Sequence, residues 1–358
     1  MIPEGRKAPV LFDVFPELSK VVPWTPLAHV PTAVEPCSAI AEWLGRGGVY
    51  MKRDDLISPL YGGNKVRRYE FVLADAMAQG AKHIVTAGGL ASTQVMATAL
   101  FGRALGLGVT SVLFDQPVTT FAQAQIRRYV QAGAQLVYGG GYLRTAYETA
   151  MAMRRRPGSY LILPGAANAL ANLGYIDAML ELGRQVEQGI TPKPDVIMLP
   201  TGSSGTLAAL ALGAAYLGWD TEILGVRITS SMVCNRASVG FVIRNTDRFM
   251  GRHVRSWGRR WSKVNFTLYG GALGRGYGAR TPEATVGIEQ LRVLTGSPGE
   301  VTYSGKALAA LHALCNTKTY ASKSILLWNT LSSVHPELAP VEHVPAALSF
   351  VMERVTKV

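Results

Sequence analysis

The residues with the clearest chemical potential in this chain lie around Lys65. Residues 61–70 read Tyr-Gly-Gly-Asn-Lys-Val-Arg-Arg-Tyr-Glu. Two glycines and an asparagine before the lysine predict a tight turn that leaves the amine accessible, and the residues after it have helical spacing. Lys65 is therefore either a solvated lysine at a strand-to-helix turn or a nucleophile that forms a Schiff base with an aldehyde cofactor.

A glycine-rich loop at residues 200–206 offers a candidate phosphate site. It reads Pro-Thr-Gly-Ser-Ser-Gly-Thr and lies between an apolar strand and an alanine-rich helix. Glycines let backbone N–H groups approach an anion, the hydroxyls can donate hydrogen bonds, and the helix dipole favours negative charge. The loop lacks the endings of a nucleotide P-loop and of a dinucleotide fingerprint. A helix cap with turn glycines is the alternative.

Two further loops have the same ambiguity between capping and binding. In the loop 88–94, Ser92 or Thr93 could cap the following helix or bind a substrate carboxylate at its N-terminus. In the loop 302–306, Ser304 could cap a helix or hydrogen-bond a ring nitrogen.

The elements that must position these loops alternate along the chain. We expect short apolar strands at residues 83–87, 108–114, 135–138, 159–164, 195–200 and 222–227, with alanine-rich helices between them. This alternation predicts an α/β fold of mainly parallel sheets covered by helices, joined by right-handed crossovers. Two such sheets, and so two lobes, fit 358 residues. Ligands of such folds bind at the carboxyl ends of the strands.

Composition narrows the class of protein. The chain is 48% hydrophobic, which indicates a compact globular protein and not a disordered one. No apolar run approaches the ~18 residues of a membrane span, and the N-terminal residues do not form a secretory signal. The three cysteines are far apart, so we expect free thiols and a cytoplasmic location. The six histidines are dispersed and no Gly-x-Ser-x-Gly motif is present, so neither a metal site nor a serine hydrolase is predicted.

The net charge of +12 is concentrated in two segments, 154–156 and 244–263. The second has six arginines with Phe249, Trp257 and Trp261 among them. We interpret it as a solvated helix face or a subunit contact. Binding of nucleic acid or of an acidic protein is the alternative, although no nucleic-acid-binding motif accompanies it.

Taken in order along the chain, these motifs resemble a known family. The resemblance extends over roughly residues 20 to 335 and is to the pyridoxal-phosphate enzymes of the D-cysteine desulfhydrase and 1-aminocyclopropane-1-carboxylate deaminase family. The motifs that carry it are Lys-Arg-Asp-Asp-Leu at 52–56, Gly-Gly-Asn-Lys at 62–65, the loop 88–94, Leu-Gly-Tyr at 173–175, the loop 200–206, Gly-Tyr-Gly at 276–278 and Tyr-Ser-Gly-Lys at 303–306.

The resemblance implies a fold type II pyridoxal-phosphate enzyme with its active site between two domains. Residues 1–68 and 179–358 would form a large cofactor-binding domain, and residues 69–178 a small one. It also implies a homodimer. Pyridoxal 5'-phosphate would be the cofactor, and no metal is expected.

The resemblance also assigns roles to individual residues. Lys65 would form the Schiff base and shuttle the proton, Ser92 would meet the substrate carboxylate, and Tyr277 and Tyr303 would bind substrate or transfer a proton. Ser304 would face the pyridine nitrogen. The implied cofactor-binding set is Asn64, Lys65, Thr93, Thr201, Gly202, Ser203, Ser204, Gly205, Thr206 and Ser304, with the loop 202–206 at the phosphate.

Three positions depart from the family pattern and are expected to reshape the pocket. Ala91 stands where a glutamine is usual, Thr93 replaces an asparagine that meets the cofactor's 3'-oxygen, and Trp328 stands in an altered C-terminal motif. A neutral hydroxyl at Ser304, in place of the deaminases' glutamate, favours elimination over ring opening.

The expected function is that of a pyridoxal-phosphate-dependent lyase or deaminase. Its substrate would be a small amino acid, D-cysteine-like or otherwise β-substituted, and the reaction would be α-proton abstraction followed by β-elimination. One alternative is β-replacement or a specialised biosynthetic step on a modified amino acid. Another is a non-catalytic binding protein that uses residues 244–263.

Overall fold

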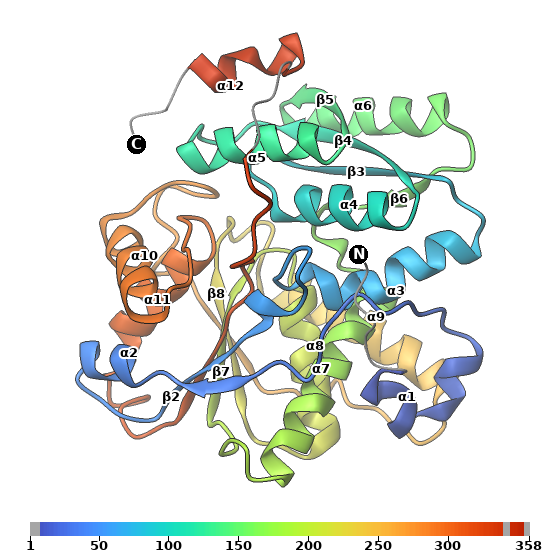
Figure 1. The fold of residues 1–358 in the computed structure, drawn as a ribbon. Helices are drawn as coiled ribbons and strands as arrows, with labels where there is room; N and C mark the ends of the chain where they lie inside the picture. Colours follow the sequence, from blue (N-terminus) through green and yellow to red (C-terminus); the bar gives the residue numbers. More distant parts are fainter. Residues whose placement is uncertain (1–7, 339–343, 354–358) are drawn as a thin grey trace.

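The larger of two sheets forms the centre of the molecule. In the computed structural model, which describes residues 8–338 and 344–353, this sheet has six strands in the order β1-β2-β10-β7-β8-β9 (Figure 1). They are β1 (Val34–Pro36), β2 (Val49–Lys52), β7 (Val196–Thr201), β8 (Glu222–Arg227), β9 (Phe266–Tyr269) and β10 (Ile325–Trp328). The β1–β2 pair is antiparallel and the other pairs are parallel.

The smaller sheet is entirely parallel, in the order β5-β4-β3-β6. Its strands are β3 (His83–Gly89), β4 (Gly108–Phe114), β5 (Gln135–Gly140) and β6 (Tyr160–Ile162). The predicted fold class, two lobes of mainly parallel sheets flanked by helices, is therefore confirmed. The strands β1, β2, β9 and β10 had not been predicted, because three or four residues are too few to show a periodic pattern.

Helices cover both faces of the larger sheet, as Figure 1 shows. One face packs against α7 (Ala169–Glu187), α8 (Gly205–Leu217) and α9 (Arg236–His253), and the other against α2 (Ser38–Trp43), α10 (Pro282–Thr295) and α11 (Ser304–Leu314). The smaller sheet is flanked by α4 (Thr93–Ala104), α5 (Thr120–Gln131) and α6 (Tyr142–Arg155), and α3 (Lys65–Ala78) lies between the sheets. The remaining elements are α1 (Val10–Val14), α12 (Ser349–Glu353) and the 3-10 turns Pro16–Lys20, Asp54–Leu56, Pro164–Ala166 and Ala346–Leu348.

The end of the described chain returns to the smaller sheet. Leu348 and Val351 are fully buried in the same core as Ile126 and Tyr129 of α5. Residues 344–353 therefore pack away from the large domain to which the sequence analysis assigned them. The boundaries after residues 68 and 178 stay a prediction.

The basic segment divides into an exposed face and a buried tryptophan. Arg244, Arg248 and Arg252 are exposed along α9. Trp257, in contrast, is fully buried, donates to Asp247 Oδ1 at 2.8 Å and stacks on Tyr216 with ring centroids 5.5 Å apart. Trp257 is a core residue and is not available to a partner.

Candidate active site

The turn before Lys65 is held by backbone contacts that two glycines permit. Gly63 has a φ of +88°, and a Cβ there would lie 2.6 Å from Thr330 O; a Cβ on Gly62 would overlap Asp55 O. The N–H of Gly63 donates to Asp54 O at 2.7 Å, and that of Asn64 donates to Thr330 O at 3.1 Å. The turn is thus held by the segment that follows β10 and by the Lys-Arg-Asp-Asp segment, and α3 begins at the lysine.

Lys65 lies in a partly buried position with a weak polar contact. Its Nζ is 3.5 Å from Gly165 O. Burial, and then the positive charge of Arg68, lower the pKa of Lys65 to about 7. A lysine with that pKa is substantially neutral at physiological pH, as a nucleophile or general base must be. The solvated alternative is therefore disfavoured.

The loop 202–206 joins β7 to α8 and leaves several N–H groups free. Ser204, the N-cap residue of α8, has a left-handed φ of +67°. Within the described residues, the N–H groups of Ser203, Ser204 and Gly205 donate to no protein acceptor. Asn64 Nδ2 reaches this loop at Thr206 Oγ1, 3.3 Å away. The loop has the form of an anion site at a helix N-terminus.

Arg68 is a further member of this site that the sequence analysis missed. Its Nη2 donates to Thr206 Oγ1 at 2.9 Å, and its Nη1 donates to Gly165 O and Ala166 O at 2.9 Å each. The guanidinium is buried, and its Nε has no partner among the described residues. A Cβ on Gly205 would lie 2.5 Å from Nη2, so only glycine lets the loop lie on the guanidinium. The sequence did offer a signal for Arg68. It lies three residues after Lys65, a spacing that places both side chains on the same side of a helix.

These groups suit a phosphate ester. An anion placed among them would pair with the unpaired donor of the buried Arg68 cation. It would also accept the free N–H groups of the loop 202–206, which lie at the N-terminus of α8. The candidate cofactor residues Asn64, Lys65 and Thr206 meet Arg68 at this place. The chemistry of the donor set therefore fits the phosphate of pyridoxal 5'-phosphate.

In the loop 88–94, the structure shows the capping role. Ser92 is the N-cap of α4, and its Oγ accepts the N–H of Val95 at 3.3 Å. Its carbonyl accepts the hydroxyl of Tyr129 at 2.8 Å, which ties the loop to α5. Thr93 is the partly buried first residue of α4. The carboxylate role of Ser92 and the cofactor contact of Thr93 stay predictions.

Tyr277 and Tyr303 come together from different loops. Their hydroxyl oxygens are 3.0 Å apart and their rings are perpendicular, with centroids 6.2 Å apart. Burial raises the pKa of Tyr277 to about 12 and that of Tyr303 well above its usual value, so both phenols are neutral. Lys306 holds the loop of Tyr277 by donating to Leu273 O at 2.8 Å and Gly276 O at 2.7 Å.

Ser304 is the first residue of α11 and is partnered by Glu300. Its Oγ accepts the Glu300 N–H at 2.8 Å and lies 3.2 Å from Glu300 O. The Glu300 carboxylate accepts the N–H groups of Thr302 at 2.6 Å and Ser304 at 3.1 Å, which caps the helix. Burial raises the pKa of Glu300, although the hydrogen bonds from these N–H groups act to lower it. Glu300 lies outside the motif that drew attention to Ser304, and so it was missed.

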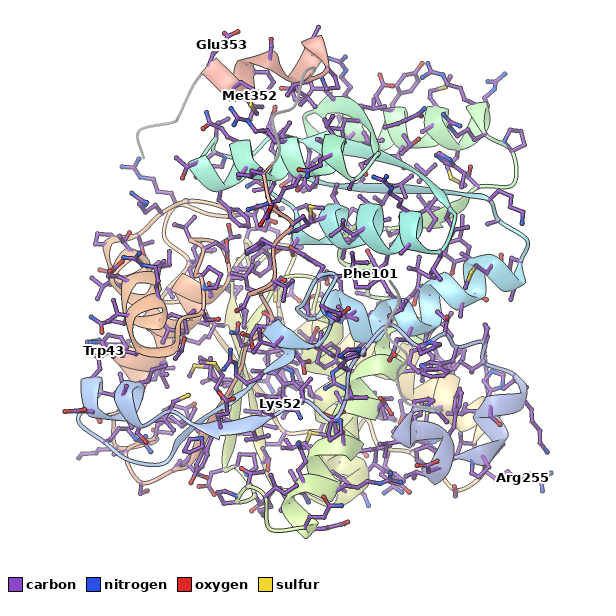
Figure 2. All side chains as sticks on the ribbon, viewed as in Figure 1. Trp43, Lys52, Phe101, Arg255, Met352 and Glu353 are labelled. Atoms are coloured by element: carbon purple, nitrogen blue, oxygen red, sulfur yellow. The ribbon has the colours of Figure 1, made fainter. Side chains whose placement is uncertain are left out.

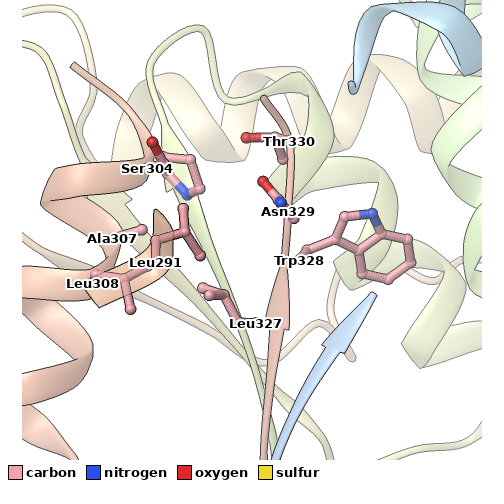
Figure 3. Close-up of a pocket in the computed structure, with 9 residues that line it drawn as sticks. Leu291, Ser304, Ala307, Leu308, Leu327, Trp328, Asn329 and Thr330 are labelled. Carbon is pink, nitrogen blue, oxygen red and sulfur yellow. The ribbon is translucent and has the colours of Figure 1, made fainter. Parts of the chain in front are cut away.

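A small cavity lies beside Ser304. It is lined by Pro200, Leu291, Ser304, Leu327, Asn329 and Thr330, among others, and Figure 3 shows Ser304 opposite Asn329 and Thr330. Pro200 leads into the loop 202–206, and Thr330 holds the turn before Lys65. The cavity therefore lies between Ser304 and the segments that adjoin the loop 202–206 and the Lys65 turn, while Lys65 and residues 202–206 are not among its lining residues. The contact of Ser304 with a ring nitrogen stays a prediction.

Trp328 lines this cavity without directing its indole ring toward Ser304. Its indole points away from Ser304 and Asn329 (Figure 3), is fully buried, and donates to Asp54 Oδ2 at 2.8 Å. Successive residues of a strand face opposite sides of a sheet, so the residue after Leu327 faces the core. Trp328 is nevertheless among the residues that line the cavity, so its expected effect on the pocket wall stays a prediction.

The Lys-Arg-Asp-Asp segment supports the site through a buried ionic network. Arg67 pairs with Asp54 and with Glu181 at 2.9 Å each, and Lys52 pairs with Glu181 at 2.6 Å. Tyr175 donates to Asp54 Oδ2 at 2.8 Å. Figure 2 shows Lys52 deep within the molecule, in contrast to Arg255 at its edge. The network fixes the start of α3, and with it Lys65.

Comparison with known proteins decides the family. The sequence profile described as "Pyridoxal-phosphate dependent enzyme" matches residues 25–330. The chain belongs to this family. The enzyme is 29% identical to the D-cysteine desulfhydrases of Salmonella paratyphi B and Salmonella newport over 312 residues, which are 83% of this chain and 88% of each relative. The predicted pyridoxal 5'-phosphate cofactor is confirmed.

Solved structures agree on the fold. The crystal structure of an ACC deaminase homologue matches with a TM-score of 0.74 and 26% identity, covering 90% of this chain and 95% of that one. The processed form of threonine deaminase isoform 2 from Solanum lycopersicum shares the fold at a TM-score of 0.60 and 18% identity, covering 98% of this chain and 90% of that one. The predicted likeness to the D-cysteine desulfhydrase and ACC deaminase family, of fold type II, is confirmed.

Three further findings concern metal ions, cysteines and membrane-spanning helices. Within residues 8–338 and 344–353, no group of side chains is arranged to hold a metal ion. Cys37, Cys234 and Cys315 are free thiols. Among the residues described, no helix combines the length and apolarity needed to cross a membrane.

Proposed function

We propose that the enzyme is a pyridoxal-phosphate-dependent lyase or deaminase that acts on a small amino acid. The substrate is D-cysteine-like or otherwise β-substituted, and it loses its α-proton and then its β-substituent. The observation that carries the proposal is the Lys65 amine, which has a pKa lowered to about 7 and lies beside the anion site of Arg68 and the loop 202–206.

The division of tasks among the residues follows from their positions. Bound pyridoxal 5'-phosphate supplies an electron sink that acidifies the α-proton of an amino acid. Arg68 and the loop 202–206 hold the phosphate, and Asn64 supports Thr206. The neutral Nζ of Lys65 accepts the α-proton.

We assign to the tyrosine pair the transfer of the proton that the leaving group needs. Tyr277 and Tyr303 are neutral and share a 3.0 Å contact, so one phenol can donate while the other stabilises the oxygen left behind. The neutral Ser304 hydroxyl favours elimination over ring opening. The names of the relatives, D-cysteine desulfhydrase and ACC deaminase homologue, support this reaction class.

The test begins with the cofactor and proceeds to the substrate. Purified enzyme loaded with pyridoxal 5'-phosphate is reduced with borohydride, and peptide mass spectrometry should find the cofactor on Lys65, with no adduct in Lys65→Ala. Panels of D- and L-amino acids with β-leaving groups are then assayed for keto acid and ammonia. An adduct on Lys65 without release of keto acid from any amino acid would overturn the proposed reaction.

The same assay separates the alternatives predicted from the sequence. With an added thiol nucleophile, a β-replacement enzyme would form a new amino acid in place of keto acid. Membership of an enzyme family disfavours the non-catalytic alternative. The homodimer and the cytoplasmic location stay proposals, as does a subunit contact through residues 244–263.

A further inference from the structure

Phe114 covers the loop proposed to meet the substrate carboxylate. It is the last residue of β4 and pairs in register with Gly89 of β3. A Cβ on Gly89 would lie 3.2 Å from Phe114 Cε2, and Leu90 N donates to Phe114 O at 3.2 Å. The ring therefore lies over the start of the loop 88–94. The same loop contains Ser92, the N-cap of α4.

The same ring also contacts the tyrosine pair. The centroids of Phe114 and Tyr277 are 6.5 Å apart, and Tyr277 in turn packs edge-on against Tyr303. Both separations are within the range of favourable aromatic contacts. Phe114 thus bridges the two loops, one from each sheet, that carry the proposed substrate groups.

On its outer side, Phe114 contacts an exposed aromatic residue. The centroids of Phe114 and Tyr142 are 5.2 Å apart. Tyr142 is the first residue of α6 and is 74% exposed, and the adjacent Leu143 is 91% exposed. Tyr303, Tyr277, Phe114 and Tyr142, which we call the aromatic row, therefore run from the buried site to the surface.

A polar group next to the row also lacks a partner. The amide oxygen of Gln116 is buried against Gly89 and accepts no hydrogen bond from any described residue. Its amide nitrogen faces Gly278, next to Tyr277. A buried acceptor without a donor is costly, so protein contacts alone do not satisfy the polar groups beside the row.

We propose that the substrate carries an uncharged apolar or aromatic extension beyond its β-carbon, and that the end of this extension lies on Phe114 and Tyr142. Single exposed apolar residues are ordinary, but here they continue an unbroken line of rings that starts at the reacting groups. Covering Tyr142 removes apolar surface from water, which favours a large substituent over a small one. This inference rests on the proposed function for the reaction, and among the proposed substrates it selects a β-substituted amino acid with a substituent larger than that of cysteine. It makes Phe114 and Tyr142 specificity-determining residues.

The experiment measures binding and not turnover. Cofactor-loaded enzyme is titrated with alanine and with phenylalanine, in both configurations, and the change in cofactor absorbance gives a dissociation constant for each. Neither ligand has a β-leaving group. We expect tighter binding of phenylalanine than of alanine of the same configuration. We expect Tyr142→Ala to reduce that preference by about three- to tenfold and Tyr142→Phe to retain it.

Tyr147 supplies the matched control. It lies on the same helix and is 62% exposed, but it forms no ring pair among the described residues. Tyr147→Ala should leave the preference unchanged. Alanine binding as tightly as phenylalanine, or a preference that survives Tyr142→Ala, would overturn the inference while leaving the proposed function standing. If neither amino acid changed the absorbance, the amino-acid site itself would be refuted, and both proposals with it.

Discussion

Lys65 and Arg68 share one acceptor, the carbonyl oxygen of Gly165. Lys65 Nζ lies 3.5 Å from this oxygen and Arg68 Nη1 lies 2.9 Å from it, although Gly165 is about a hundred residues away in the chain. Burial lowers the pKa of Arg68 to about 10, so its guanidinium remains charged at neutral pH. That charge is the second cause, after burial, of the lowered pKa of Lys65.

The rate at which the cofactor attaches to Lys65 should therefore change with pH near neutrality, well below the pH at which a solvated lysine loses its proton. Only the neutral amine attacks an aldehyde, so the rate of attachment of pyridoxal 5'-phosphate to the apo-enzyme should rise through about pH 7 and level off well below pH 10. Stopped-flow absorbance across this range gives the midpoint. A midpoint near the value of a free lysine would show that the amine is solvated.

Arg68→Gln should weaken binding of the phosphorylated cofactor. Loss of a buried charge-assisted contact is expected to raise its dissociation constant by about ten- to a hundredfold. Pyridoxal, which has no phosphate, provides the control, because its affinity should change little. The midpoint for attachment should also move upward, since a positive charge near Lys65 is removed. Equal loss of affinity for both compounds would point to general damage to the fold.

Tyr303→Phe should slow elimination and leave the cofactor in place. It removes one hydroxyl of the 3.0 Å pair with Tyr277, and loss of a positioned proton donor costs about 10²- to 10⁴-fold in rate. The absorbance of bound cofactor should be unchanged. Tyr320→Phe is the matched control, since Tyr320 is also buried and hydrogen-bonded, to Glu222 at 3.0 Å, away from the site. A rate within twofold of wild type for Tyr303→Phe would remove the phenol from the mechanism.

Asp54→Asn should destabilise the whole fold. Asp54 is fully buried and accepts hydrogen bonds from Arg67, Tyr175 and Trp328. Loss of its charge leaves the two buried cations of the network, Lys52 and Arg67, with Glu181 as their carboxylate partner. The free energy of unfolding should fall by about 3–5 kcal/mol. Denaturant titration measures it, with the exposed pair of Glu289 and Arg292 as control. Glu289→Gln should have little effect, and a similar loss in both variants would contradict a structural role for the network.

Much of the site could be predicted because its signals are local. Glycines before Lys65 and around Ser203 indicate turns through the backbone conformations that they allow, and strand and helix periods place those turns at sheet edges. The Arg68 contact, the Glu300 cap and the core position of Trp328 were missed. Each depends on which residues distant in the chain become neighbours, or on which face of an unpredicted strand a side chain lies.

Residue types and their order were by themselves enough to predict the α/β class and, through the family resemblance, the cofactor, whereas for Lys65 and the three loops they left a solvated or capping role open. Tertiary structure alone decided that Arg68 lies beneath the phosphate loop, that Tyr277 meets Tyr303, and that Phe114 joins them to Tyr142 at the surface. Local propensity acts through the backbone of a few consecutive residues. The pKa of Lys65 and the shape of the entrance instead arise from burial and contacts between segments that only the packed sheets bring together.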